Sequence, residues 1–266
     1  MIEWWQAAVL ALLQGLTEFL PISSSAHLVI PSLMFGWADQ GLAFDVAVHV
    51  GTLLAVIAYF HRDLLAMAGA LGQGLYQRRM NEGSRQVLFL GLATLPVLAT
   101  GFLFDDLIEA RLRTLPVIAL TTLGFGLALW LADRAARRGV QRDMTLPIAL
   151  AVGLAQAVAP IPGVSRSGVT ITAGLLLGLS HQSAARFSFL LSIPVIAGAG
   201  LLKAVDLAML DASVPWLQLG FAAALAGLTA YFCIAFFLRL IDRIGLMPFV
   251  YYRIALALVL VALWLA

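Results

Sequence analysis

Long apolar runs, separated by short polar segments, dominate the chain. A transmembrane helix takes about 20 apolar residues, with a lower limit of about 17. Six runs meet or nearly meet this requirement, at approximately 44–60, 86–104, 115–132, 185–203, 215–238 and 248–265. The pattern predicts an all-α, polytopic integral membrane protein that forms a single membrane domain over residues 1–266.

Two further apolar regions are interrupted near their middle. Residues 3–36 break at EFLPISSS and residues 146–179 break at APIPGVSRSG, which leaves halves of about 14 residues, too short to cross a bilayer. Surface loops joining four short helices would explain the interruptions. So would two re-entrant helical hairpins, whose irregular backbone must find its hydrogen-bond partners in protein or in a water-filled cavity. We predict the re-entrant hairpins.

Composition supports the membrane class. The chain is 62% hydrophobic and 11% charged, whereas soluble domains carry about 25% charged residues. The single cysteine, Cys233, excludes an internal disulfide and a thiolate metal cluster. The first residues lack a basic segment and a cleavage site, so we expect no signal peptide. The net charge of +2 comes from short loops, and we expect no nucleic-acid partner.

Basic residues are distributed unevenly between the loops. If the two broken regions are re-entrant and the six spans alternate, eleven arginines lie on one side, and Arg111, Arg113 and Lys203 lie on the other. The arginine-rich side is then cytoplasmic. Both termini face the exterior, the first hairpin enters from outside, and the second enters from the cytoplasm.

The two halves of the chain resemble each other. LLQGLTEFLPISSSAHLVI aligns with GLAQAVAPIPGVSRSGVTI with one gap, so that Gln14 meets Gln156 and Ser24 meets Ser165; later, Pro116 meets Pro248. Each half contains one hairpin and three spans, and an odd number of crossings inverts the second half. We therefore predict an inverted-topology repeat, approximately 1–132 and 144–266, of the kind found in many transporters.

The second break, PGVSRSGVT, has the composition of a phosphate site. A helix that starts there presents free N–H groups and a partial positive charge, and a guanidinium suits phosphate oxygens. An arginine at this depth costs about 2.5–3.5 kcal/mol, which a bound anion would offset; pairing with a carboxylate or snorkelling to the interface are the alternatives. The candidate substrate-binding residues are Arg166, Ser165, Ser167, Thr170, Gly163 and Gly168.

The first break carries candidate catalytic groups. Ser24 and His27 share a face if the second half is helical, and they make a plausible nucleophile and base. Ser23 and Ser25 are further candidates for substrate binding, although one of the three serines is expected to cap the helix. Glu18 is placed to act as a base, to orient His27 or to hold a divalent cation. An ion pair between Glu18 and Arg166 is the structural alternative.

Other polar residues carry weaker signals. Asp45 and His49 are one helical turn apart, and we expect them to hydrogen-bond at the mouth of the first span. His61 and His181 fall at loop edges, where we expect them to be solvated. We expect Arg253 to snorkel, with a structural pairing as the alternative. Residues 63–78 are expected to form an interfacial helix.

At these two breaks the chain resembles the undecaprenyl-diphosphate phosphatase family, intramembrane enzymes associated with bacitracin resistance. The resemblance rests on QGLTEFLPISSSAH, on PGVSRSGVT, on FSFLLSIP at 187–194 and on the dipeptide YR at 252–253, and it extends over essentially the whole chain. It implies hydrolysis of a C55 polyprenyl diphosphate to its monophosphate and inorganic phosphate, which recycles the lipid carrier of cell-wall precursors.

The resemblance also implies roles and surroundings. Ser24 would be the nucleophile and His27 its partner. Glu18 and Gln14 would form the acidic motif and hold a divalent cation, Mg²⁺ or Ca²⁺, with Glu18 as the only carboxylate because Gln14 cannot ionise. Ala26 stands where a glycine is expected in relatives. The protein would lie in the bacterial cytoplasmic (inner) membrane with its site open to the external face, and a homodimer is compatible with it.

A transporter or flippase for a phosphorylated lipid or another anion is the alternative function. Inverted repeats with half-helix termini that point at an anion suit transport equally well. A carrier needs the anion-binding arginine, but it does not need a nucleophile beside a base. Glu18, Ser24 and His27 therefore favour an enzyme.

Overall fold

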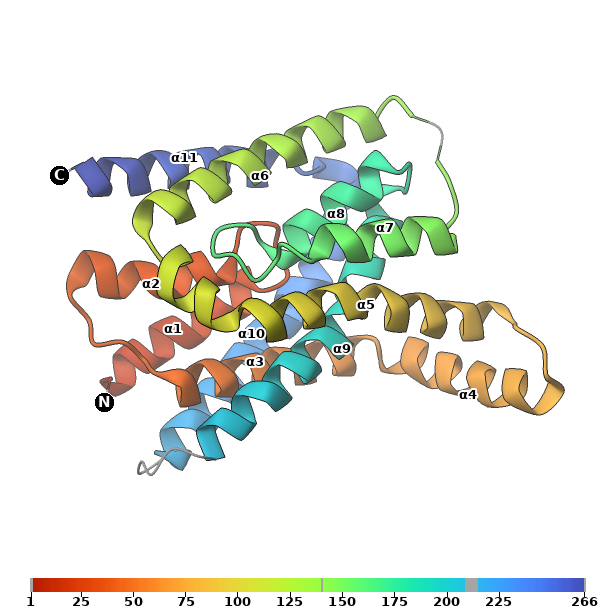
Figure 1. The fold of residues 1–266 in the computed structure, drawn as a ribbon, viewed down its shortest axis with the longest axis horizontal. Helices are drawn as coiled ribbons and strands as arrows, with labels where there is room; N and C mark the ends of the chain where they lie inside the picture. Colours follow the sequence, from red (N-terminus) through yellow and green to blue (C-terminus); the bar gives the residue numbers. More distant parts are fainter. Residues whose placement is uncertain (1, 140, 209–214, 266) are drawn as a thin grey trace.

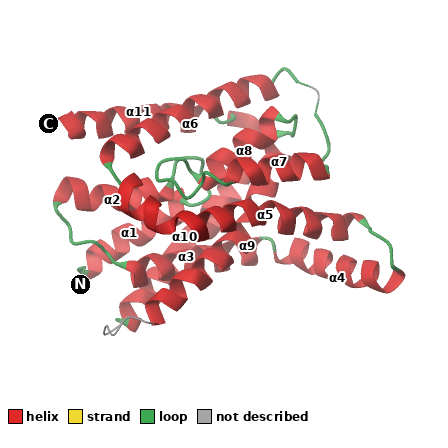
Figure 2. Cartoon of the chain, in the orientation of Figure 1, coloured by secondary structure: helices red, strands yellow, loops and turns green. Residues whose placement is uncertain are grey.

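A computed structural model of the chain describes residues 2–139, 141–208 and 215–265, and within these ranges it contains helices and loops and no strand (Figure 2). The elements are α1 (Trp4–Thr17), α2 (Ser24–Phe35), α3 (Leu42–Tyr59), α4 (His61–Gln77), α5 (Glu82–Leu107), a π-helical turn η1 (Ile108–Leu112), α6 (Leu115–Ala136), α7 (Leu146–Gln156), α8 (Arg166–Leu176), α9 (His181–Ala208), α10 (Trp216–Ile244) and α11 (Met247–Leu265).

Six helices in the described part of the chain are long and apolar enough to cross a membrane: α3, α5, α6, α9, α10 and α11. They coincide with the six predicted runs, so the all-α, multi-pass membrane class is confirmed. Their ends extend beyond the apolar cores, as in α10, which continues to Ile244. Polar residues can continue these helices beyond their apolar cores, because the backbone hydrogen bonds of a helix form within the helix itself.

The two broken regions form helical hairpins. α1 and α2 have 14 and 12 residues, and α7 and α8 have 11 each, so none is longer than about 21 Å. Prolines stop the first helix of each hairpin, because Pro21 lies four residues after Thr17 and Pro160 four residues after Gln156, and neither has the N–H that would extend its helix. The turns 18–23 and 157–165 face each other in the interior of the helical bundle (Figure 1). A position inside the bundle is compatible with re-entrant hairpins, and their re-entrant path through a membrane stays a prediction.

The two halves correspond helix by helix. α1 packs on α10 and α7 on α5; α3 packs on α10 and α9 on α5; and α6 packs on α11. In Figure 1, α3 and α6 run from left to right, whereas their counterparts α9 and α11 run from right to left. The packing and the directions support the predicted inverted repeat.

The turns correct the register of that repeat. Ser23 and Ser165 each precede the second helix of their hairpin, and each has the same unusual left-handed backbone, with φ 76° and 71°. Ser23, and not Ser24, is therefore the counterpart of Ser165. Gln14 and Gln156 precede these two serines by equal distances along the chain, so the halves align here without a gap.

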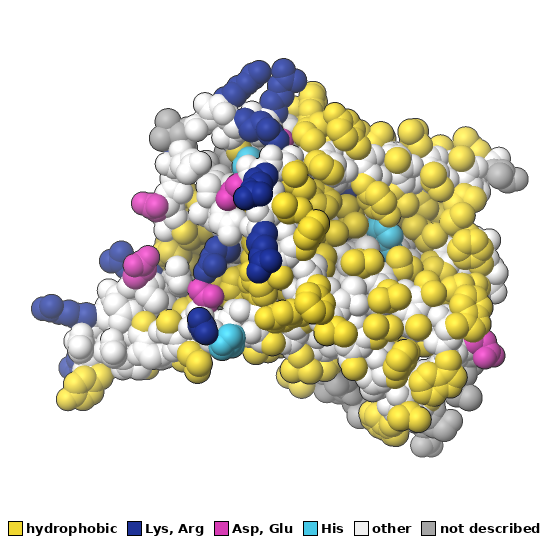
Figure 3. Space-filling model, turned by 180° about the vertical axis from the view of Figure 1, so that it is seen from behind, with side chains coloured by type: hydrophobic (Ala, Val, Ile, Leu, Met, Phe, Trp, Pro, Cys, Tyr) yellow, Lys and Arg dark blue, Asp and Glu magenta, His cyan; other side chains and the backbone are white. Residues whose placement is uncertain are grey.

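Charge is gathered at one end of the molecule. Lys and Arg side chains crowd the end toward which α4 extends, while the rest of this face is largely apolar (Figure 3). Residues 63–78 were predicted to be helical and form most of α4, which packs on α5. Leu65, Leu75 and Tyr76 of α4 are exposed. Its location at a membrane interface stays a prediction.

Glycines allow α3 and α10 to pack closely against each other. At Gly51 of α3, a Cβ would overlap the backbone of Ala223 in α10, and at Gly227 of α10 a Cβ would lie 2.8 Å from the carbonyl oxygen of Gly51. Small residues let helices approach in membranes, where dispersion and packing replace the hydrophobic effect as the source of association.

Gly51→Ala is therefore expected to push α3 and α10 apart and to lower the free energy of unfolding by about 1–3 kcal/mol. Thermal unfolding of the detergent-purified protein measures the effect. Gly220→Ala in α10 is the matched control, because no atom lies within 4 Å of its added Cβ, and alanine favours a helix. Equal melting temperatures for Gly51→Ala and the parent protein would contradict this packing.

Candidate active site

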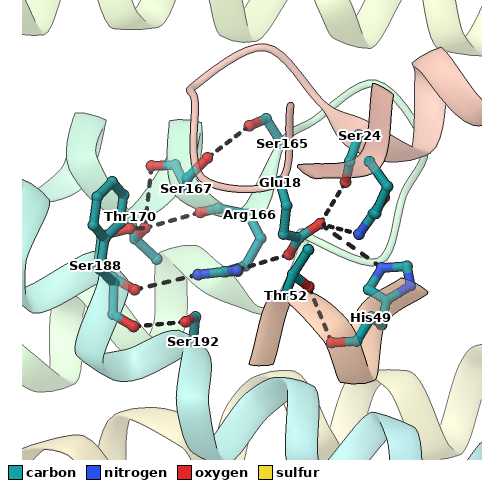
Figure 4. A network of polar contacts seen from close by, with 12 residues as sticks. Glu18, Ser24, His49, Thr52, Ser165, Arg166, Ser167, Thr170, Ser188 and Ser192 are labelled. Atoms are coloured by element: carbon teal, nitrogen blue, oxygen red, sulfur yellow. Dashed lines mark hydrogen bonds and ion pairs between the residues drawn. The ribbon is translucent and has the colours of Figure 1, made fainter. Parts of the chain in front are cut away.

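The two turns bring the predicted chemistry together. Glu18 follows the last residue of α1, Ser24 begins α2, and Arg166 begins α8. All three point toward one another between the turns, with α3 and α9 alongside (Figure 4). Residues that lie far apart in the sequence thus form one polar network inside an apolar bundle.

Glu18 is the centre of this network, and its side chain is almost fully buried. Its Oε2 accepts hydrogen bonds from Ser24 Oγ at 2.6 Å and from Gln14 Nε2 at 3.0 Å, and its Oε1 accepts one from Arg166 Nη2 at 2.8 Å. A carboxylate with several donors is strongly stabilised in its ionised form. Glu18 can therefore receive a proton from Ser24 only when some of these donors are withdrawn or redirected.

Arg166 is compensated within the protein. Besides its ion pair with Glu18, Nη1 donates to the backbone oxygen of Ser188 at 3.2 Å, and the guanidinium lies 5.8 Å from the centre of the Phe19 ring. The side chain is 11% exposed, so it does not snorkel. Of the alternatives considered for this arginine, pairing with a carboxylate is correct, and its burial does not by itself require a bound anion.

The hydroxyl groups of the second turn and of the start of α8 form hydrogen bonds within the protein. Ser165 Oγ accepts from the N–H of Gly168 at 3.1 Å, Ser167 Oγ donates to the carbonyl of Leu20 at 2.8 Å, and Thr170 Oγ1 shares a 2.7 Å bond with Ser188 Oγ. Because these three side chains are buried and engaged, they stabilise the contact between the turns. This geometry differs from the predicted array of free phosphate donors.

The two glycines of the second turn are also buried against protein. Gly163 has φ +89°, and a Cβ there would overlap Thr121 Oγ1 of α6; at Gly168, a Cβ would lie 3.0 Å from the Cβ of Ser165. Both permit close packing of the turn. Neither has the open surface that direct contact with a substrate requires.

The first turn is more accessible. Ser24 is half-buried and Ser25 is exposed, whereas Ser23 is buried. Ser23 occupies the capping position of α2, but its hydroxyl is 3.1 Å from that of Ser25 and forms no capping bond. Ser24 is therefore the hydroxyl that combines access with a carboxylate partner.

His27 forms no hydrogen bond with Ser24 in the structure, and its catalytic pairing with Ser24 stays a prediction. Its Nδ1 lies 2.6 Å from the backbone oxygen of Ser23, its Nε2 lies 2.6 Å from the hydroxyl of Tyr252, and the two rings stack. Sequence spacing places Ser24 and His27 on one helical face, but both ring nitrogens of His27 are engaged by other partners, one in the same turn and one in α11.

His49 belongs to the site, which the sequence interpretation missed. Its Nδ1 lies 2.7 Å from the backbone oxygen of Asp45, and its Nε2 lies 3.7 Å from Glu18 Oε2. The expected hydrogen bond to Asp45 is present through the backbone, while the carboxyl of Asp45 accepts from Gln40. Nothing in the local sequence indicates that α3 turns His49 toward the first hairpin.

Oxygen donors for a cation lie beside Glu18. In the described residues no group of three or more His, Cys, Asp or Glu side chains is arranged to hold a metal ion. Gln14 Oε1, however, is buried next to the Glu18 carboxylate and has no hydrogen-bond partner. Carboxylate and amide oxygens suit Mg²⁺ and Ca²⁺, so these two residues fit a cation that takes its other ligands from phosphate oxygens or water.

Arg253 is buried, contrary to the expectation that it snorkels. It is 1% exposed and donates to four backbone carbonyls. Nη1 and Nη2 reach Pro21 in the first turn and Gly163 in the second, at 3.3 and 2.7 Å, while Nε and Nη2 reach Thr122 and Thr121 of α6. One guanidinium therefore binds both turns to α6.

Another expectation is corrected at the basic end. His181 was expected to be solvated, but its Nε2 lies 2.7 Å from Asp133 Oδ1 and its side chain is only 17% exposed. Arg137 Nε binds the other oxygen of the same carboxyl at 2.9 Å. His61 is exposed, as expected.

Comparisons with known proteins agree on one family. A family model described as Bacitracin resistance protein BacA matches residues 7–259. Proteins named Undecaprenyl-diphosphatase are similar over nearly the whole chain: that of Alcanivorax borkumensis is 55% identical over all of both chains, that of Teredinibacter turnerae is 54% identical over 95% of this chain and 96% of its own, and that of Hahella chejuensis is 50% identical over 96% of each.

Arg253→Lys is expected to lower the thermal unfolding temperature, because an ammonium presents its donors at one point and cannot serve both turns and α6. Each buried carbonyl that loses its partner costs about 1–3 kcal/mol. Arg239→Lys, at an exposed position of α10, is the control and should melt like the parent protein. Unchanged melting of Arg253→Lys would show that the guanidinium is dispensable for joining the turns.

Proposed function

We infer that this chain, which belongs to the bacitracin resistance protein BacA family, is an undecaprenyl-diphosphatase. It hydrolyses undecaprenyl diphosphate to undecaprenyl phosphate and inorganic phosphate, recycles the lipid carrier of cell-wall synthesis and confers bacitracin resistance. Relatives with this name cover the chain at 50–55% identity. The observation that carries the mechanism is the Ser24 hydroxyl bonded to Glu18, whose other oxygen binds Arg166.

The substrate's terminal phosphoryl group binds beside Arg166, between the two turns. Phosphoryl transfer needs positioning and charge neutralisation more than covalent assistance from the protein. Phosphate oxygens compete with Glu18 for the guanidinium, and the planar fork suits them. When Arg166 turns to the phosphate, the Glu18 carboxylate loses its strongest partner and becomes more basic.

Ser24 is the nucleophile in this mechanism. Its oxygen forms a bond to the terminal phosphorus, its proton passes to Glu18 Oε2, and the bond from that phosphorus to the bridging oxygen breaks. Undecaprenyl phosphate leaves with the bridging oxygen and the electron pair of that bond. Water then attacks the phosphorus of the phosphoserine and the bond from Ser24 Oγ to phosphorus breaks. Inorganic phosphate is released, Ser24 Oγ takes up a proton, and the proton held by Glu18 is lost to solvent.

His27 has a different role in this scheme. Direct attack by His27, or activation of water by it, would require the ring to leave Ser23 and Tyr252. We propose instead that His27 fixes the start of α2, and thus the position of Ser24, through its bond to the backbone of Ser23.

A divalent cation, expected from the family resemblance, would be held by Glu18 and Gln14 together with phosphate oxygens. When bound, it would neutralise charge on the diphosphate. The buried Gln14 oxygen that lacks a partner supports this placement.

The protein is embedded in the bacterial cytoplasmic membrane with its arginine-rich end inside and its site open to the external face. The charge asymmetry supports this orientation. Ser25 and His49, the more accessible groups near the site, lie in α2 and α3, whose connecting loop is at the opposite end from α4 (Figure 1).

Phosphate release from undecaprenyl diphosphate by the detergent-purified protein tests this function. Detergent micelles have no two compartments, so a carrier without hydrolase activity would release no phosphate in this assay. Arg166→Lys should slow release by about 10²–10³-fold, as for loss of a transition-state donor, and Ser24→Ala by at least as much. Ser32→Ala, which removes a hydroxyl of α2 that bonds within its own helix, is the control. Absence of release by the parent protein would leave a carrier as the better function.

Rapid acid quench with substrate labelled in its terminal phosphate identifies the nucleophile. We expect acid-stable phosphoserine that is missing in Ser24→Ala. Acid-labile label would assign the attack to a histidine, and the absence of label would assign it to water. Either result would remove the covalent role from Ser24 while leaving the hydrolase function intact.

Cysteine labelling tests the orientation. In a Cys233→Ala background, Asp39→Cys in the loop between α2 and α3 should react with a membrane-impermeant maleimide on intact spheroplasts. Tyr76→Cys in α4, at a position 91% exposed, should react only after the membrane is permeabilised. The reverse pattern would invert the predicted topology.

A further inference from the structure

The second helices of the two hairpins start in different ways. Ser165 caps α8: its Oγ accepts from the N–H of Gly168 at 3.1 Å, and its backbone oxygen accepts from the N–H of Val169 at 2.9 Å. In the first hairpin, the hydroxyl of Ser23 makes no capping bond, and the backbone bond from the N–H of His27 to the Ser23 oxygen is 3.4 Å long. The start of α2 therefore lacks the usual capping support.

The imidazole of His27 supplies the missing support. Its Nδ1 lies 2.6 Å from the backbone oxygen of Ser23, much closer than the backbone N–H of the same residue. Ser23 has a left-handed backbone with φ 76°, which residues other than glycine adopt only where their surroundings hold them. The next residue is Ser24, whose hydroxyl bonds to Glu18. The position of the nucleophile thus depends on the contact between His27 and Ser23.

The protonation of His27 follows from its surroundings. A backbone carbonyl can only accept a hydrogen bond, so the contact with Ser23 places an N–H on Nδ1. His27 is only 6% exposed and has no carboxylate partner in the described part of the chain, while Arg253 already brings a positive charge to the same turn. A second, unpaired charge is disfavoured there. The ring is therefore neutral, with its lone pair on Nε2.

Tyr252 occupies that lone pair. Its hydroxyl lies 2.6 Å from Nε2 of His27, and the two rings stack with 13° between their planes. Because the neutral ring carries its proton on Nδ1, the phenol is the donor in this bond. Tyr252 belongs to α11, in the second half of the chain, so a hydroxyl from one half fixes a ring in the other.

We propose that Tyr252 is a positioning residue for the reaction: its hydroxyl orients His27, and His27 holds the backbone from which Ser24 is presented to the substrate. The inference rests on the proposed function for the role of Ser24. Two hydrogen bonds in series connect the phenol to the residue before the nucleophile. Loss of the phenol hydroxyl therefore changes the geometry of attack while every reacting group stays in the protein.

Nitrogen NMR of the detergent-purified, full-length protein labelled with ¹⁵N-histidine tests both bonds without turnover. The chain has four histidines, and replacing His49, His61 and His181 in turn by glutamine identifies the signals of His27 by elimination. We expect a neutral ring with its proton on Nδ1. Tyr252→Phe keeps the stacked ring and removes the donor, so the Nε2 signal should move to that of an acceptor without a hydrogen bond, while the proton stays on Nδ1.

Phosphate release from undecaprenyl diphosphate tests the consequence for the reaction. Tyr252→Phe should lower kcat by about 10- to 10²-fold, as expected when a reacting group is displaced, with little change in KM. Tyr251→Phe is the matched control. This neighbouring residue is 65% exposed, and its hydroxyl has no hydrogen bond in the part of the chain that the structure describes. The control should leave the His27 signals and kcat as in the parent protein.

The outcomes separate this proposal from the phosphatase function. A cationic ring, a proton on Nε2, or an Nε2 signal that is unchanged in Tyr252→Phe would overturn the bond from the phenol. An unchanged kcat in Tyr252→Phe would overturn the positioning role, and a raised KM with the parental kcat would assign the phenol to substrate binding instead. The NMR results stand even if the parent protein releases no phosphate, and the parent ring alone identifies the donor if Tyr252→Phe does not fold.

Discussion

The structure depends on how two irregular turns satisfy their backbone inside an apolar bundle. In a membrane, every backbone carbonyl outside regular secondary structure must accept a hydrogen bond from protein or from enclosed water. Arg253 donates to Pro21 in one turn and to Gly163 in the other, and Ser167 of the second turn donates to Leu20 of the first. The turns are therefore joined to each other as well as to α6, and the proposed active site is built on that junction.

The junction explains how opposite charges come to be buried together. Glu18 and Arg166 sit on different hairpins and are held 2.8 Å apart because the backbones that carry them are fixed. A buried ion pair contributes little net stability, since the cost of removing both charges from water offsets their attraction. In the mechanism we propose, the pair is a preorganised arrangement in which a phosphate replaces the carboxylate as partner of the arginine.

Much of this could be predicted from the sequence. Hydrophobic run lengths gave the six spans, and prolines with serines and glycines gave the two hairpins, because both signals are local. The partners of His27, His49 and Arg253 could not be predicted. Each of these contacts depends on how a helix or a ring is rotated, which tertiary packing decides. Tyr252 and Arg253, for example, are neighbours in α11, yet Tyr252 contacts His27 and Arg253 contacts both turns. An arginine within an apolar run can be recognised in the sequence, but the sequence does not indicate which backbone carbonyls accept its hydrogen bonds.

Arg253 also bears on the symmetry of the fold. It lies five residues after Pro248, as Thr121 lies five after Pro116, and the two residues touch at 3.4 Å through Arg253 Nη2 and the Thr121 carbonyl. In the predicted inverted repeat, corresponding positions that touch would lie on the pseudo-twofold axis. Two identical subunits would place two guanidinium groups at this point, where like charges repel and the carbonyls suffice for one. In this single chain only one of the two positions carries an arginine and the other is Thr121, so that conflict does not arise.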